Sequence, residues 1–177
     1  DLKDVDSLNT KYKLGTLLTL KNPGTYNKKN IKYTVYNRDI LSVDKNSNNG
    51  EAELKGGLGT TYVRAEVGSA YVIFTFHVVD TTAPDPVKIK YNDTKTNKVD
   101  RAFTIKTGEV YGSNLKNLVK VIDGNVATDV EWKVDDTSVV SVTDGVVKGL
   151  SAGKAVITAV TKNGYYVTFV VTVADGM

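Results

Sequence analysis

The sequence contains no cysteine and a single histidine, His77. The absence of cysteine excludes disulfide bonds, thiol catalysis and cysteine-ligated metal sites. One histidine excludes a metal site built from several histidines, and it restricts any Ser-His-Asp arrangement to the surroundings of His77. This residue falls on the outward face of an expected strand and has no suitable Ser or Asp partner by spacing. We therefore interpret it as an ordinary exposed or edge histidine.

Long apolar runs and blocks of like charge are also missing. No apolar segment approaches the ~20 residues that a membrane-spanning helix needs, so we expect no membrane span. The 23 basic and 20 acidic residues give a net charge of +3 without a Lys/Arg cluster, which argues against nucleic-acid binding. No phosphate-binding loop or nucleophile elbow is present, and the paired Glu51 and Glu53 look solvated. We expect no catalytic activity.

No signal peptide or lipidation signal marks either end of the sequence. The 177 residues suit one large domain or two small ones. We expect the sequence to be part of a longer chain.

The dominant pattern in the sequence is alternation of apolar and polar residues, which predicts β-strands with one buried face. In the segment 70–79 (AYVIFTFHVV), residues 70, 72, 74, 76 and 78 share one face. In the segment 166–173 (YVTFVVTV), residues 167, 169, 171 and 173 do the same. One stretch, residues 113–119, predicts a loop or a short 3₁₀ turn instead. The pattern indicates an all-β protein.

Turn signals separate these strands at short intervals. Gly68-Ser69, Asp144-Gly145 and Asn163-Gly164 lie between apolar runs. Asn-Gly and Asp-Gly supply the positive φ angles that tight hairpins need. We expect a hairpin at each of the three positions.

The chain divides into two related halves around the segment 80–86 (DTTAPDP), which holds two of the three prolines. Proline cannot lie inside a central strand and stiffens a connection. We therefore predict a domain over residues 1–80, a linker over residues 81–86 and a second domain over residues 87–177. The period of about 95 residues fits one small sandwich. The predicted fold is two tandem immunoglobulin-like antiparallel β-sandwiches of about seven strands each.

Corresponding residues recur in the same order in both halves. Tyr33 takes the place of Trp132, and Gly59 takes the place of Gly153 at the start of a strand, where a residue without Cβ is favoured. The other matched positions are Ser42-Val43 with Ser141-Val142, Gly50 with Gly145, Val63 and Ala65 with Ile157 and Ala159, Phe74, Phe76 and Val78 with Phe169, Val171 and Val173, and Asp80 with Asp175.

The second half resembles the bacterial immunoglobulin-like domain, group 2. The resemblance covers residues 87–175 and rests on Trp132, on the strand DTSVVSV at 136–142, on GVVKGL at 145–150 and on AGKAVITA at 152–159. The first half matches with a longer loop at 44–50. The core that we predict for the second half is Trp132, Val134, Val140, Val142, Ile157, Ala159, Val167, Phe169 and Val171.

What the resemblance implies is a role, with no shared catalytic residues. Such domains are spacers and adhesive modules of bacterial surface or secreted multi-domain proteins. We therefore expect an extracellular location at the bacterial cell surface or wall, with other domains of the same protein as partners. One alternative is a module that binds cell-wall or host polysaccharide, or host protein. Another is a building block of an S-layer or phage tail lattice.

Acidic residues near the linker are candidate calcium ligands. Asp80 and Asp85 flank the linker, and calcium needs about six to eight converging oxygens. The loop 44–50 (DKNSNNG) superficially resembles a calcium loop, but its glycine falls one place late and no bidentate Glu follows. Asp135-Asp136 is a further acidic pair. The alternative for all of them is turn chemistry, because Asp and Asn side chains bond nearby backbone. We expect no cofactor, with calcium as the one alternative.

Exposed tyrosines are the candidate ligand-binding residues. Tyr165 and Tyr166 follow the Asn163-Gly164 turn, and Tyr71 lies at the matching place in the first half. Carbohydrate modules stack sugar rings on such side chains. The alternative is that each tyrosine simply covers a sheet edge, as is common in strands.

Overall fold

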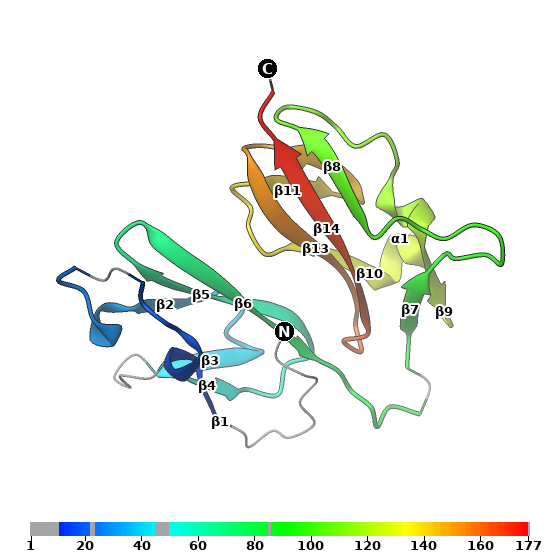
Figure 1. Cartoon of the computed structure of the whole chain (residues 1–177). Coiled ribbons are helices and arrows are strands. Elements are labelled where there is room, and N and C mark those ends of the chain that lie inside the picture. Colours follow the sequence, from blue (N-terminus) through cyan, green and yellow to red (C-terminus); the bar gives the residue numbers. More distant parts are fainter. Residues whose placement is uncertain (1–10, 22–23, 45–49, 85, 177) are drawn as a thin grey trace. The chain divides into compact units, whose positions relative to one another are not determined.

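The computed structural model describes residues 11–21, 24–44, 50–84 and 86–176. The chain divides into two compact units, Asp1–Val78 and Val79–Met177. Both units are built from β-sheets, antiparallel except for one strand pair of the second unit (Figure 1). The predicted all-β, immunoglobulin-like fold is confirmed.

The first unit packs two three-stranded sheets around one core. One sheet has the order β1-β4-β3 and the other has the order β2-β5-β6, both antiparallel. Two 3₁₀ turns, η1 (Leu14–Leu17) and η2 (Lys28–Asn30), lie between β1 and β2. The strands are β1 (Lys11–Lys13), β2 (Lys32–Val35), β3 (Leu41–Asp44), β4 (Glu51–Leu54), β5 (Gly59–Val67) and β6 (Ala70–Val78).

The second unit has a larger main sheet, with the order β10-β13-β14-β8, and two strand pairs, β11-β12 and β7-β9. The pairing of β8 with β14 is parallel, in contrast to the antiparallel pairing predicted throughout. Its elements are β7 (Lys88–Tyr91), β8 (Ala102–Lys106), η3 (Leu115–Leu118), β9 (Val119–Ile122), α1 (Val126–Asp129), β10 (Val130–Val134), β11 (Val140–Thr143), β12 (Val146–Gly149), β13 (Gly153–Thr161) and β14 (Tyr166–Ala174).

The core of the second unit follows the predicted alternation. Seven of the nine predicted core residues are buried, whereas Trp132 and Val142 are only half-buried and pack against the core. Phe169 is fully buried, and ten further residues, Leu115 and Val147 among them, join the seven in the core. The sequence pattern missed Leu115 and Val147 because they lie in short elements.

The three predicted hairpin turns are confirmed. Two residues join Val67 to Ala70 at Gly68 (φ 60°), and two join Thr143 to Val146, where Asp144 (φ 51°) and Gly145 (φ 79°) lie in the left-handed region. Gly164 (φ 85°) turns β13 into β14. The 3₁₀ turn expected within 113–119 is η3. The expectation that it would be the only helical turn is wrong, because η1, η2 and α1 also form.

The two units share a register that supports their internal repeat. Tyr33 pairs with Ala65 across β2 and β5, and Trp132 pairs with Ala159 across β10 and β13. The 3₁₀ turns correspond as well: the Leu14 N–H donates to the Gly50 carbonyl at 3.2 Å, and the Leu115 N–H donates to the Gly145 carbonyl at 2.9 Å. Corresponding positions therefore make the same strand pairing and the same backbone hydrogen bond in both units.

Candidate functional site

The Asp80 carboxylate is used in a local turn. It accepts hydrogen bonds from the Thr82 hydroxyl at 2.7 Å and the Thr82 N–H at 2.8 Å, and the hydroxyl bond is the main cause of its lowered pKa. This is the turn chemistry expected of Asp. Asp85 lies outside the described residues. Within the described ranges, no three His, Cys, Asp or Glu side chains gather as a metal site would require. Calcium binding at Asp80 and Asp85 stays a prediction.

The Asp135-Asp136 pair organises the turn between β10 and β11. Asp135 Oδ1 accepts from the Val156 N–H and the Asp136 N–H, both at 2.7 Å. Burial raises the pKa of Asp135. Asp136 Oδ1 accepts from the Ser138 N–H at 3.0 Å and the Ser138 hydroxyl at 2.5 Å. The calcium-like loop at 44–50 has residues 45–49 outside the described part of the chain.

The three candidate tyrosines have different surroundings. Tyr71 is exposed, and the Arg64 guanidinium lies 3.8 Å from its ring centroid. Tyr165 is half-buried, with Lys88 Nζ 5.5 Å from its ring centroid. Tyr166 is half-buried in β14, next to Tyr165 in sequence. The Arg64 guanidinium covers one face of the Tyr71 ring. A sugar ring could therefore stack only on the other face.

His77 is half-buried and bonded to a neighbouring strand. Its Nδ1 lies 2.9 Å from the Thr60 hydroxyl, and the two residues are paired across β5 and β6. This contact joins two strands of one sheet. Glu53, one of the paired carboxylates, forms an ion pair with Lys55 at 2.9 Å.

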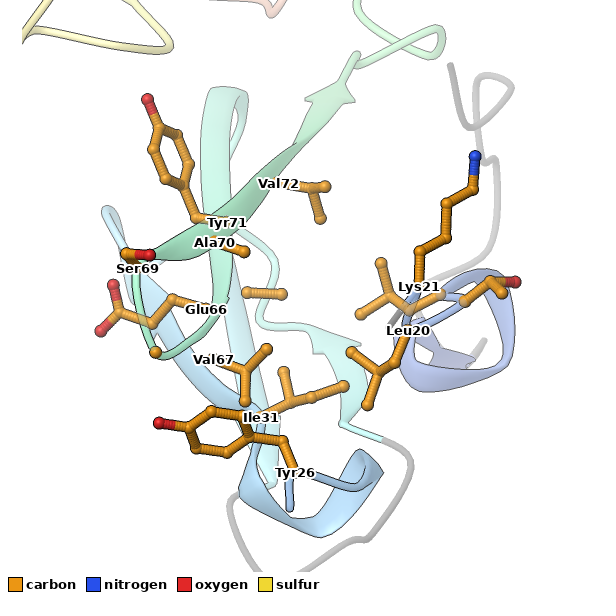
Figure 2. Close-up of a pocket in the computed structure, with 14 residues that line it drawn as sticks. Leu20, Lys21, Tyr26, Ile31, Glu66, Val67, Ser69, Ala70, Tyr71 and Val72 are labelled. Carbon is orange, nitrogen blue, oxygen red and sulfur yellow. The ribbon is translucent and has the colours of Figure 1, made fainter. Parts of the chain in front are cut away.

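The first unit contains a cavity that the sequence did not predict. It has a volume of about 520 Å³ and lies between the β5–β6 hairpin and the segment 18–31 (Figure 2). Its apolar lining includes Leu18, Leu20, Tyr26, Ile31, Val67 and Val72. A volume of this size falls within the range of roughly 300–1,000 Å³ typical of ligand sites.

The wall of the cavity formed by residues 24–31 is held by side-chain bonds. Asn27 caps η2 by accepting from the Lys29 N–H at 2.9 Å, and Asn30 Oδ1 accepts from the Asn27 N–H at 2.8 Å. Lys28 Nζ donates to the Gly15 carbonyl at 2.7 Å. The Tyr26 ring lies at the hairpin turn, where a Cβ on Gly68 would meet it at 3.5 Å. These bonds fix the conformation of the wall, and Tyr26 brings it against the hairpin turn.

The sequence carried a weak signal for this cavity. Leu18 and Leu20 alternate like strand residues, and the turn signal Asn22-Pro23-Gly24 follows them. In the structure they lie in an irregular segment. An alternation this short cannot indicate which residues lie opposite it in the cavity.

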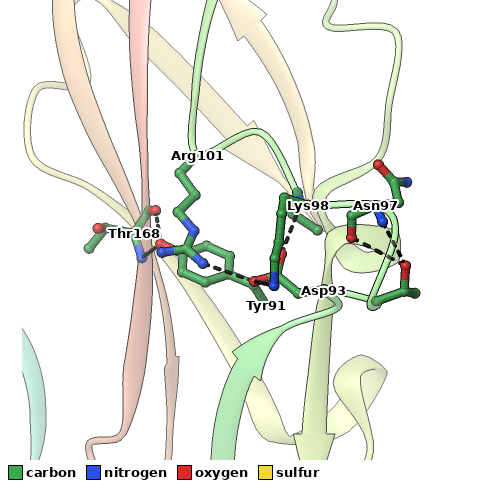
Figure 3. Close-up of polar contacts among 8 residues, drawn as sticks. Tyr91, Asp93, Asn97, Lys98, Arg101 and Thr168 are labelled. Carbon is green, nitrogen blue, oxygen red and sulfur yellow. Dashed lines mark hydrogen bonds and ion pairs between the residues drawn. The ribbon is translucent and has the colours of Figure 1, made fainter.

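A polar network in the second unit ties β7 to β14 (Figure 3). The Tyr91 hydroxyl donates to the Thr168 carbonyl and accepts from the Thr168 N–H at 3.1 Å. The Arg101 guanidinium lies 4.2 Å from the Tyr91 ring centroid and pairs with Asp93 at 2.9 Å. Asp93 also accepts from the Val99 N–H at 2.8 Å, the main cause of its lowered pKa. The network fixes the connection between β7 and β8.

Among the described residues, no helix has the length and apolar character needed to cross a membrane.

Comparison with known proteins gives only distant similarities. No protein-family model matches the chain, and no curated protein sequence matches it. The resemblance to bacterial group 2 immunoglobulin-like domains therefore stays a prediction.

Three solved structures illustrate the similarity in fold. Domains 4 and 5 of the S-layer protein SbsC are 18% identical over 89% of this chain and 74% of theirs, with a TM-score of 0.35. SbsC domains 4–9 are 17% identical over 90% of this chain and 23% of that one, with a TM-score of 0.37. A C-terminal intimin fragment solved with its receptor domain is 15% identical over 87% of this chain and 55% of the fragment, with a TM-score of 0.29. Similarity at this level does not place the chain in a family.

Proposed function

We propose that this chain is a non-catalytic spacer in a bacterial surface or secreted multi-domain protein, and that its units belong to the group 2 immunoglobulin-like family. In this role the two units hold neighbouring domains away from the cell wall and carry tension. Two separately cored sandwiches in series suit such a role, because each unit can bear load by itself.

The observation that carries this proposal is the parallel pairing of β8 with β14. Val170 pairs with Ala102, and the register continues to Ala174 opposite Lys106. Tension pulls β14 toward its C-terminal end, and it reaches β8 through β7 and residues 92–101, pulling β8 toward its N-terminal end. In a parallel pair these pulls slide the strands along each other, so all the ladder hydrogen bonds are loaded together. An antiparallel pair loaded from one end would open one bond at a time.

The Tyr91 hydroxyl supports the same load path. β8 pairs with β14 from Val170 onward, and the Val170 N–H donates to the Arg101 carbonyl at 2.8 Å. Beyond the end of β8, the Tyr91 hydroxyl bonds the backbone of Thr168. The edge of β14 is thus paired over a longer stretch than β8 alone covers, and β7 shares the load.

Single-molecule stretching of the whole chain tests the proposal. The two units are distinguishable because the fully extended chain reaches about 270 Å over residues 1–78 and about 350 Å over residues 79–177, so their unfolding steps differ in length. We expect Thr107→Pro to lower the unfolding force of the longer step, because the Thr107 N–H donates to the Ala174 carbonyl at 3.0 Å. The shorter step serves as an internal reference within each molecule.

Thr104→Pro is the matched control. The Lys106 N–H donates to Glu109 Oε2 at 2.7 Å and so points away from β14, and alternation along the strand gives the Thr104 N–H the same direction. Proline at 104 should therefore remove no bond to β14. Equal effects of the two prolines, or a second unit that unfolds at no higher force than the first, would reject the load-bearing role.

Light scattering separates a spacer from a lattice component. A spacer remains monomeric both in millimolar calcium and in chelator. Growth into large species only with calcium would replace the spacer proposal with the lattice alternative, and would direct attention to Asp80 and Asp85. Binding of a glycan on an array, abolished by substitution of Tyr71, Tyr165 or Tyr166, would favour a polysaccharide-binding module instead.

A further inference from the structure

The segment that leads from β6 into β7 is fastened at two points to the turn between β13 and β14. The Asp80 N–H donates to the Asn163 carbonyl at 2.9 Å. The Val87 N–H donates to Asn163 Oδ1, also at 2.9 Å. All three residues belong to the second unit, Val79–Met177. One residue of the turn therefore accepts a hydrogen bond from each end of the segment 80–87.

The end of the segment at Val87 is held by a further, buried bond. Thr161 Oγ1 donates to the Val87 carbonyl at 2.7 Å. The Val87 side chain is buried in the core of the second unit, and Thr161 is buried as well. Opening this end would leave a buried carbonyl and a buried hydroxyl without partners, which is costly. Val87 is therefore held firmly in place.

The end of the segment at Asp80 is held less deeply but is locally ordered. The Asp80 carboxylate accepts from the Thr82 N–H and hydroxyl, so residues 80–82 form a turn. The rings of Pro84 and Pro86 fix two φ angles of the segment. Fewer conformations are then available to the unfastened chain, so fastening it costs less entropy.

The fastening groups are absent from the corresponding hairpin of the first unit. Ala159 corresponds to Ala65, so Thr161 corresponds to Val67, which has no hydroxyl to donate. Two residues join β5 to β6, whereas residues 162–165 join β13 to β14. Asn163 lies in this longer turn. An immunoglobulin-like sandwich therefore does not need these groups for its own hairpin, and in the second unit they hold the incoming chain.

We infer that Asn163 fixes the joint between the two units, so that they move relative to each other only through the backbone around Val79. β6 ends at Val78, and Asp80 is already bonded to the second unit. A hinge works through the few residues that absorb changes in φ and ψ, and here a single residue is left for that purpose. Without the bonds to Asn163, the whole segment 79–87 would be free to turn. This joint does not depend on the load-bearing role of β8 and β14.

Amide hydrogen exchange of the whole chain, followed by NMR, tests the bonds themselves. The N–H groups of Asp80 and Val87 should be protected, whereas the Thr81 N–H, which bonds no other described residue, should exchange freely. Asn163→Ala should make the Val87 N–H exchange about tenfold faster. Asn163→Asp keeps an oxygen that can accept the same bond and should restore the protection. Unprotected Asp80 and Val87 in the wild type would overturn the inference.

The distance distribution between two spin labels tests the joint. The chain contains no cysteine, so Lys29→Cys and Lys154→Cys place one label on each unit, both at exposed positions. Insertion of Gly-Ser-Gly after Val79 gives the breadth of a free joint. We expect a narrow distribution without further substitution, and in Asn163→Ala a shift toward the breadth of the insertion variant.

Asn117→Ala is the matched control, because Asn117 is an exposed asparagine of the same unit. A distribution in Asn163→Ala no broader than in Asn117→Ala would overturn the inference. So would a wild type as broad as the insertion variant, a comparison that stands even if Asn163→Ala does not fold. Trp132 fluorescence and circular dichroism check the fold of the second unit in every variant.

Discussion

Gly50 is a residue whose role only the folded structure shows. Its φ is 56°, and a Cβ at this position would lie 2.3 Å from Cζ of the buried Tyr33 ring. Gly24 has nearly the same φ, 55°, but a Cβ there would meet nothing within 4 Å. The two glycines therefore separate the cost of a left-handed backbone from the cost of a clash in the core.

We predict that Gly50→Ala destabilises the first unit more than Gly24→Ala does. The left-handed conformation should cost each alanine about 1–2 kcal/mol, and overpacking against Tyr33 should add about 1–3 kcal/mol at residue 50 alone. Urea unfolding followed by far-ultraviolet circular dichroism measures both. Similar losses in the two variants would mean that the Tyr33 ring moves aside freely.

Asp135 is a half-buried carboxylate whose titration should be visible in stability. Burial raises its pKa in the folded state, so the folded protein binds this proton more tightly than the unfolded chain does. The resulting stabilisation is fully present below the unfolded pKa of about 3.9 and is lost as the pH rises through the higher folded-state pKa.

We predict that the stability of the wild type relative to Asp135→Asn falls as the pH rises above about 3.9. The amide does not titrate, and its oxygen can still accept from the Val156 N–H. Urea unfolding followed by Trp132 fluorescence, repeated across the pH range, measures the difference. A difference that stays constant or rises with pH would contradict the prediction.

Asp93 provides the opposite trend in the same unit. Its pKa is lowered, chiefly by the Val99 N–H and also by Arg101 and Lys98. Its contribution is therefore present above about pH 3.9 and lost as the pH falls through the lower folded-state pKa. The wild type should gain stability relative to Asp93→Asn as the pH rises, which checks the sign of the Asp135 measurement.

At the scale of the element, the strands and turns that were predictable are those with local signals. The alternation in 70–78 and 166–174 marked β6 and β14, and Asp144-Gly145 marked the β11–β12 turn. The parallel pairing of β8 with β14 had no such signal, because residues far apart in sequence determine it. The short helical elements η1, η2 and α1 were missed because three or four residues cannot show a helical period.

The Tyr91 hydroxyl also joins two strands, β7 and β14, that lie far apart in the sequence. It bonds both backbone groups of Thr168, a residue 77 positions later, where β8 no longer covers the edge of β14. A side chain thus continues a strand ladder. Nothing in the local sequence around Tyr91 could identify its partner.

We predict that Tyr91→Phe lowers the stability of the second unit by about 1–2 kcal/mol, since two backbone groups lose their partner. Amide exchange at Thr168 should become faster, while exchange in the middle of β13 should change less. Tyr111→Phe is the control, because its ring is stacked on Phe103 at 3.8 Å and its hydroxyl bonds no other described residue. Unchanged exchange at Thr168 would show that water replaces the hydroxyl without cost.

At the scale of the whole molecule, composition and repeats predicted the fold class, but the candidate site of greatest interest escaped them. The acidic residues and tyrosines could be named from the sequence because the residue type alone indicates their binding chemistry. The cavity beside Leu18 and Leu20 is lined by the segment that follows η1 and by the β5–β6 hairpin. Only the folded structure shows it, because Leu18 and Leu20 lie more than 40 positions before the hairpin residues that line it.

The unequal size of the two buried cores among the described residues has a consequence for unfolding. Among the described residues, the buried apolar core has eleven members in the first unit and seventeen in the second. Less apolar burial means less stabilisation, so we predict that the first unit unfolds at lower denaturant concentration. Trp132, the single tryptophan, lies in the second unit and reports that unit alone, whereas far-ultraviolet circular dichroism reports both.

The two probes should therefore give transitions that do not coincide, with circular dichroism changing first. Coincident curves would show that the two units unfold as one or are equally stable, despite the smaller core of the first unit.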